Sequence, residues 1–91
     1  MYEGDWQDGL RSGKGKMTYE NADEYEGEFQ RNMKHGKGKF VKGNNSVFYY
    51  DGEWKYNMRH GHGVQNEKTH RYEGEFVRDK KHGHGTLIYY D

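Results

Sequence analysis

The 91-residue sequence contains no cysteine and no proline. The lack of cysteine excludes disulfides and thiolate metal sites, which fits the cytosol. No apolar run approaches the roughly 20 residues that a membrane-spanning helix needs, and no signal peptide is visible, because Met1 is followed at once by charged residues and glycine. The formal net charge is zero, so we expect no nucleic-acid partner, because such proteins usually carry a basic excess.

Hydrophobic residues are also few, at 30% against 33% charged residues. That balance alone would suggest disorder. However, aromatic residues reach 16%, and the glycines recur at regular positions. Disordered low-complexity segments do not space their aromatic residues, so we expect a folded chain whose organisation is set by internal repeats.

The sequence consists of four copies of one short unit. Each unit opens with a tyrosine, followed by a glycine two positions later and a large aromatic residue four positions later. Acidic residues flank that glycine in every unit, and an arginine or lysine stands nine positions after the tyrosine. The opening tyrosines are Tyr2, Tyr25, Tyr50 and Tyr72, and the large aromatic residues are Trp6, Phe29, Trp54 and Phe76.

Two further glycines complete each unit, eleven and thirteen positions after the tyrosine. Length varies only between the repeated cores, where loops tolerate it. We divide the chain into one array with repeats at 2–24, 25–49, 50–71 and a truncated 72–91. Because repeat arrays normally need capping ends, we expect the array to belong to a longer one or to be capped by partners.

The unit has the pattern of a β-hairpin. Residues 2–6 alternate between apolar and polar, which indicates a strand with one face of each kind. A second extended run follows, such as 11–19. The sequence therefore predicts an all-β antiparallel meander without helices. The predicted tight turns are Asp8-Gly9, Arg31-Asn32, Tyr56-Asn57 and Arg78-Asp79, in which glycine, asparagine and aspartate tolerate a positive φ.

The glycines of the second strand predict how the aromatic rings pack. Glycine often marks a close approach by another group, and a tryptophan or phenylalanine ring of the same or a neighbouring hairpin can lie flat only where no Cβ blocks it. We also expect turns between units, at 20–23 and 43–46. In the third unit, Gln65 and Asn66 replace apolar residues of the other copies, so we expect that hairpin to be shorter or more exposed.

The motif resembles the MORN repeat (membrane occupation and recognition nexus), as in residues 25–29 followed by 34–38. The resemblance covers almost the whole chain and implies a single-layer, twisted antiparallel sheet of successive hairpins. Members of that family are linked to phosphoinositide binding, to cytoskeletal and ciliary scaffolds, to membrane junctions, and to appendages of lipid kinases and lysine methyltransferases. Residues 76–89 are also similar to repeats of radial-spoke head proteins of motile cilia.

The aromatic–glycine face is the leading candidate site. A single-layer sheet leaves this face open unless a partner covers it, and tyrosine and tryptophan are frequent at binding hot spots. The alternative is that the rings cover only one another and the glycines. We predict a non-enzymatic scaffold of a ciliary (axonemal) or other cytoskeletal assembly, whose partners are other proteins and further MORN repeats end to end. The predicted partner-binding residues are Tyr2, Trp6, Tyr25, Phe29, Tyr50, Trp54, Tyr72 and Phe76.

A second hypothesis is a phosphoinositide-binding membrane module. Its candidate site is a basic ridge on the opposite face, formed by Lys14, Lys16, Lys37 and Lys39. Basic residues near an anionic lipid surface contribute about 1 kcal/mol each, but the interleaved acidic residues would cancel much of this attraction. Opposite charges on neighbouring strands alternatively form a self-paired face that supports the sheet.

Other chemistry has little support in the sequence. The pairs His60/His62 and His82/His84 could approach one another as a zinc or nickel site, but they occupy ordinary repeat positions. Residues 13–16 lack the spacing and the hydroxyl residue of a phosphate-binding loop. A thin sheet also offers no desolvated pocket to shift the pKa values of the many carboxylates and histidines. We therefore predict no enzyme activity, no metal and no cofactor.

Overall fold

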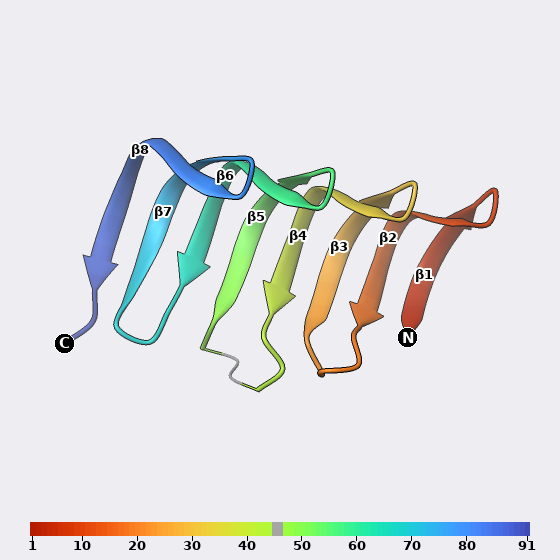
Figure 1. Ribbon diagram of the computed structural model, residues 1–91, viewed down its shortest axis with the longest axis horizontal. Coiled ribbons are helices and arrows are strands. Elements are labelled where there is room, and N and C mark those ends of the chain that lie inside the picture. Colours follow the sequence, from red (N-terminus) through yellow and green to blue (C-terminus); the bar gives the residue numbers. More distant parts are fainter. Residues whose placement is uncertain (45–46) are drawn as a thin grey trace.

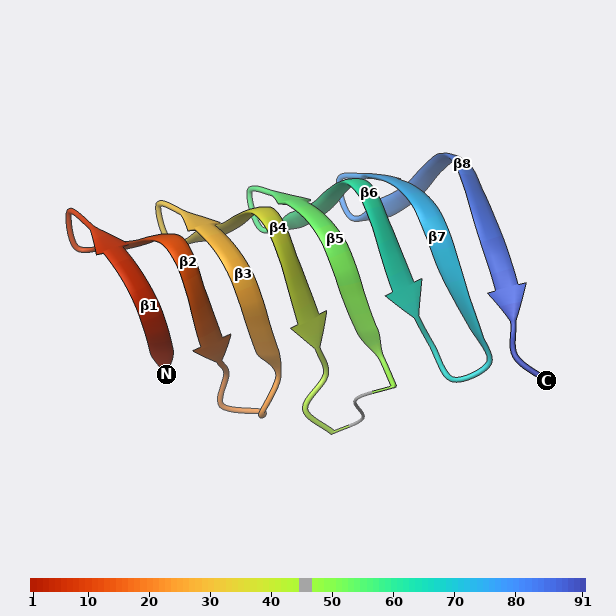
Figure 2. The ribbon, with the colours of Figure 1, turned by 180° about the vertical axis from the view of Figure 1, so that it is seen from behind.

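The chain forms one open antiparallel sheet, as the sequence predicts. The computed structural model describes residues 1–44 and 47–91, and each of its strands pairs with its neighbours along the chain (Figures 1 and 2). The described residues contain no helix, and the turn predicted at 43–46 lies partly outside them. The strands are β1 (Tyr2–Gln7), β2 (Leu10–Thr18), β3 (Glu24–Gln30), β4 (Met33–Val41), β5 (Tyr49–Lys55), β6 (Met58–Asn66), β7 (His70–Val77) and β8 (Lys80–Tyr89).

Two-residue turns join the strands of each hairpin at the predicted positions. In the second turn, Arg31 has φ 48° and Asn32 has φ 69°. The other three turns also combine two residues of positive φ, which matches the right-handed twist of the flanking strands. Asparagine, aspartate and glycine at the second position of these turns are among the residues that adopt such φ values at least cost.

Each hairpin also carries a bulge, which in the first three units is filled by one of the repeated acidic residues. Between the pairs Gly27↔Gly38 and Phe29↔Lys34, β3 advances by two residues and β4 by four. The carboxylate of Glu28 lies in this bulge and accepts a hydrogen bond from the Lys37 backbone N–H at 2.6 Å. Asp5 and Glu53 make the equivalent bonds in the first and third units. The acidic residue after the first glycine therefore has a structural role in these units.

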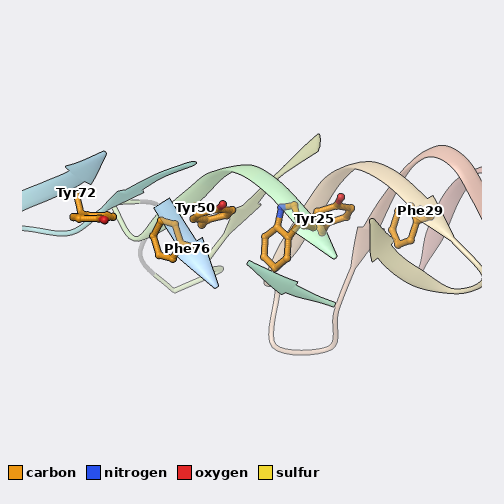
Figure 3. Close-up of a cluster of buried hydrophobic side chains, with 6 residues drawn as sticks. Tyr25, Phe29, Tyr50, Tyr72 and Phe76 are labelled. Atoms are coloured by element: carbon orange, nitrogen blue, oxygen red, sulfur yellow. The ribbon is translucent and has the colours of Figure 1, made fainter. Parts of the chain in front are cut away.

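The sheet is a single layer, with Cα extents of 46 × 28 × 15 Å. The tight turns lie along one edge and the longer connections along the other, and the two ends of the chain lie at opposite ends of the array (Figure 1). The core lies on one face of this layer, where aromatic rings from successive hairpins form a row (Figure 3). Its buried members are Tyr25, Phe29, Tyr50, Trp54, Tyr72 and Phe76.

The expectation of a shorter or more exposed third hairpin is wrong. β6 has nine residues, like β2 and β4, and the Asn66 side chain is only 9% exposed. The Asn66 amide donates to the Val47 carbonyl at 2.7 Å and accepts from the Tyr90 hydroxyl. Gln65 accepts a hydrogen bond from Arg59. These hydrogen bonds satisfy the polar side chains, so the strand keeps its length without apolar residues there.

Candidate functional site

An aromatic ring lies on the glycines of each hairpin, as predicted, but it belongs to the tyrosine that opens the unit and not to the expected tryptophan or phenylalanine. A Cβ placed on Gly38 would come within 2.2 Å of the Tyr25 hydroxyl oxygen. The hydroxyl donates to the Glu28 carbonyl at 2.8 Å, so the buried polar atom has a partner. Tyr50 repeats the arrangement over Gly63. The glycine column is therefore required by the ring above it.

The second aromatic column joins neighbouring units. The Trp54 ring makes edge-on contacts with Tyr50 of its own unit and with Tyr25 of the preceding unit, at centroid distances of 5.0 and 5.5 Å. Its indole N–H donates to the Gly38 carbonyl at 2.9 Å. Phe29 and Phe76 also lie between the tyrosines of two units. The row of rings is thus continuous along the array.

The predicted partner-binding residues divide into two groups by exposure. Tyr2 is half-buried and Trp6 is 59% exposed. The remaining six are buried and form the core, so they present little surface to a ligand in this structure: Tyr25, Phe29, Tyr50, Trp54, Tyr72 and Phe76. Binding of a partner at these residues stays a prediction.

Other rings of the same face border two adjoining hollows. One pocket of about 450 Å³ is lined by Phe40 and Phe48, with Trp54 also in its wall. A neighbouring hollow of about 460 Å³ is lined in part by Tyr19 and again by Phe40. We call the two hollows together the aromatic groove. Sequence reasoning did not identify these half-buried rings as a site.

Lys34 lies between the two hollows and lines both. Its ammonium nitrogen is 4.9 Å from the centroid of the Trp54 ring and 5.0 Å from that of Phe40. It is also within 5.7 Å of the Tyr19 and Tyr25 ring centroids. Burial lowers the pKa of Lys34, and the negative charges of Asp79 and Asp23 oppose this effect. The groove thus contains a cation surrounded by aromatic faces.

Two hydrogen bonds join the backbone of Lys34 to Asn57 of the next unit. Its N–H donates to the Asn57 side-chain carbonyl at 2.8 Å, and the Asn57 N–H donates to the Lys34 carbonyl at 3.0 Å. The pairs Arg11/Asn32 and Arg59/Asp79 repeat this arrangement. The sequence showed the repeated basic residue and the repeated turn residue. It did not reveal that the turn residue of one unit binds the basic residue of the unit before it.

The basic ridge lies among carboxylates, as the charge pattern predicts. Lys16 is the register partner of Glu26, and its ammonium is 3.7 Å from Glu24. Lys37 is the register partner of Glu53. Lys14 and Lys39 likewise have acidic register partners: Glu28 for Lys14, and Glu26 and Asp51 for Lys39. Lipid binding by the ridge stays a prediction, and these neighbours weaken its attraction for anions.

The histidine pairs do not converge with acidic residues into a recognisable metal centre. Within residues 1–44 and 47–91, no group of three or more histidine, cysteine, aspartate or glutamate side chains could hold a metal ion. His62 instead lies 3.4 Å from Glu75 on the neighbouring strand. In the same part of the chain, no helix is long and apolar enough to cross a membrane.

Comparison with known proteins agrees with this geometry. A search of curated proteins finds no match. The family model of the MORN repeat matches four segments of the chain, at residues 2–24, 25–47, 50–65 and 72–91. MORN repeats are generally non-enzymatic modules that interact with proteins or membranes. Because the matched segments cover most of the sequence and the structure forms the corresponding hairpins, the chain belongs to the MORN repeat family.

Proposed function

We propose that the chain is a scaffold element that binds a helix or an extended peptide of another protein in the aromatic groove. The observation that carries this proposal is the pair of adjoining hollows on the aromatic face, which share Lys34 and Phe40. An elongated, largely apolar depression of this kind suits a segment of polypeptide, because alternate side chains can enter successive hollows. The formal net charge of zero agrees with a protein partner better than with a polyanion.

We further propose a place for this scaffold in the cytoplasm, in a ciliary or other cytoskeletal assembly. Support for this finer proposal comes from the likeness of residues 76–89 to repeats of radial-spoke head proteins. The regular array, with each hairpin contacting its neighbours, also suits a rigid spacer within a larger assembly.

The test is a comparison of two variants as bait in extracts of ciliated cells. Phe40→Ser removes a half-buried ring from the groove, and Lys37→Met changes an exposed residue of the opposite face. Circular dichroism would first confirm that both variants are folded. We expect axonemal proteins to be retained by the wild type and by Lys37→Met and lost with Phe40→Ser. Equal retention by all three would contradict the groove as the binding site, and retained proteins of another cytoskeletal structure would contradict only the ciliary location.

The alternative function is phosphoinositide binding through the basic ridge. Its support is the presence of four lysines on one face, and the register of those lysines opposite carboxylates argues against strong binding. Flotation with phosphatidylcholine vesicles, with and without phosphoinositide, tests it at low and physiological salt. Binding that survives physiological salt and is lost when the four lysines become glutamine would favour the membrane module over the scaffold.

A further inference from the structure

Lys34 is the half-buried lysine of the aromatic groove. Among the basic side chains that line the pocket beside Phe40 and Trp54, Arg59 is paired with Asp79 at 3.2 Å, and Lys42 is exposed to solvent. Lys34 is half-buried, and in the described part of the chain no carboxylate forms an ion pair with it. Its surroundings are rings, which interact with an ammonium but do not neutralise it.

Such a cation favours a ligand that brings one negative charge and covers it with apolar surface. Removing an ammonium from water is costly unless a counter-charge replaces the lost hydration. Covering the groove would complete the desolvation of Lys34, so an apolar ligand alone would be penalised. A ligand with a carboxylate near Lys34 would form a charge-assisted hydrogen bond in a site of low dielectric constant.

The walls of the pocket also restrict the size of that negative charge. Glu67 and Asp79 line the same pocket as Lys34, and Glu20 and Asp23 line the adjoining hollow. A phosphate group with several negative charges would approach these carboxylates and meet repulsion, whereas a single carboxylate would meet much less. The groove therefore fits a peptide carboxylate better than a lipid phosphate.

We propose that the partner of the aromatic groove is a peptide segment in which an aspartate or glutamate, placed against Lys34, adjoins a bulky apolar residue that enters the pocket beside Phe40 and Trp54. This inference rests on the proposed function and adds the chemistry of the partner. The two hollows on either side of Lys34 give the peptide room to continue in both directions. Lys34 would then act as the specificity-determining residue of the groove.

The experiment uses a phage library of short randomised peptides, selected on the whole chain. The strongest peptide is then measured by fluorescence anisotropy, together with its version in which the acidic residue is replaced by the matching amide. Both peptides are tested against the wild type, against Lys34→Met and against Lys37→Met as the control on the opposite face. Methionine keeps the length and flexibility of the side chain and packs well on aromatic rings, so the groove keeps its shape.

We expect selected peptides to share an acidic residue next to a bulky apolar one. The amide version should bind the wild type and Lys37→Met roughly tenfold more weakly or worse, and the two versions should bind Lys34→Met almost equally. Selected peptides that lack an acidic residue but lose binding with Phe40→Ser would overturn this inference and leave the proposed function standing. A library without binders, or binding only of phosphoinositide vesicles in a Lys34-dependent manner, would overturn both.

Discussion

The two tryptophans of this chain occupy the same position of the repeat, yet their surroundings differ. Trp6 is 59% exposed, whereas Trp54 is 7% exposed. Both rings make an edge-on contact at 5.0 Å with the tyrosine of their own unit. The difference is that Trp54 also packs against Tyr25 of the preceding unit and donates its N–H to Gly38. Burial of this column is therefore a property of the interface between units, and the single hairpin does not provide it.

The largest expected effect separates the two tryptophans directly. Trp54→Ala should lower the free energy of unfolding by about 3–5 kcal/mol, because a buried ring and its hydrogen bond are lost. Trp6→Ala should cost about 1 kcal/mol or less, since mainly the contact with Tyr2 is removed. Urea denaturation followed by far-ultraviolet circular dichroism measures both values. Similar losses for the two variants would show that the interface between units does not determine the stability of the column.

The next effect concerns the glycine below a buried ring. Gly38→Ala should destabilise the fold by about 1–3 kcal/mol, because the new methyl group would overlap the Tyr25 ring in a well-packed site. The same denaturation assay measures the change. The double variant Gly38→Ala with Tyr25→Ala is the control, because the added methyl should then cost much less. An unchanged cost in the double variant would mean that the ring is not the reason for the glycine.

A smaller effect should come from the bonds between units. Asn57→Gly keeps a residue that readily adopts the positive φ of this turn and removes only the side-chain carbonyl that accepts from Lys34 N–H. We expect a loss of about 1 kcal/mol, the usual contribution of one such hydrogen bond. Gly9, at the same place in the first turn, shows that glycine is compatible with the turn itself. A loss within the error of the measurement would argue that water replaces the asparagine without cost.

The buried tyrosines should make the free energy of unfolding depend on pH only in strong alkali, with no such contribution near neutral pH. Burial raises the pKa of Tyr50 to about 12, against an ordinary value of 10.0. The neutral phenol is therefore favoured by the folded state, and this stability is complete below pH 10 and is lost as the pH rises towards 12. Burial raises the pKa of Tyr25 as well. Ultraviolet absorbance of phenolate, compared between the wild type and Tyr50→Phe, would detect a delayed titration, and ordinary titration of Tyr50 would contradict its burial.

Much of the fold could be predicted from the sequence because its signals are local. Alternating residues indicate strands, and the residue types at 31–32 and 56–57 indicate tight turns, so the hairpins could be placed before the structure was known. The glycine columns likewise predicted that an aromatic ring lies on them, although they did not identify it as the tyrosine. Each of these signals lies within one unit of the repeat.

The site was harder to predict because it depends on contacts between units. The burial of Trp54 requires a ring that lies 29 positions earlier in the chain, and the place of Lys34 requires Asn57, 23 positions later. Asn66 was misjudged for the same reason, because its hydrogen-bond partners, Val47 and Tyr90, come from other segments. A single sequence gives the residue types of these columns without the contacts between them.

The sequential order of the strands also affects how the chain would respond to mechanical tension. Every strand is held by the strands next to it in sequence, and the termini lie at the two ends of the row (Figure 2). A force that separates the termini would act on the hydrogen bonds of one outermost strand at a time. The strands would therefore detach one after another at comparatively low force. An array with this strand order would therefore release length gradually when stretched.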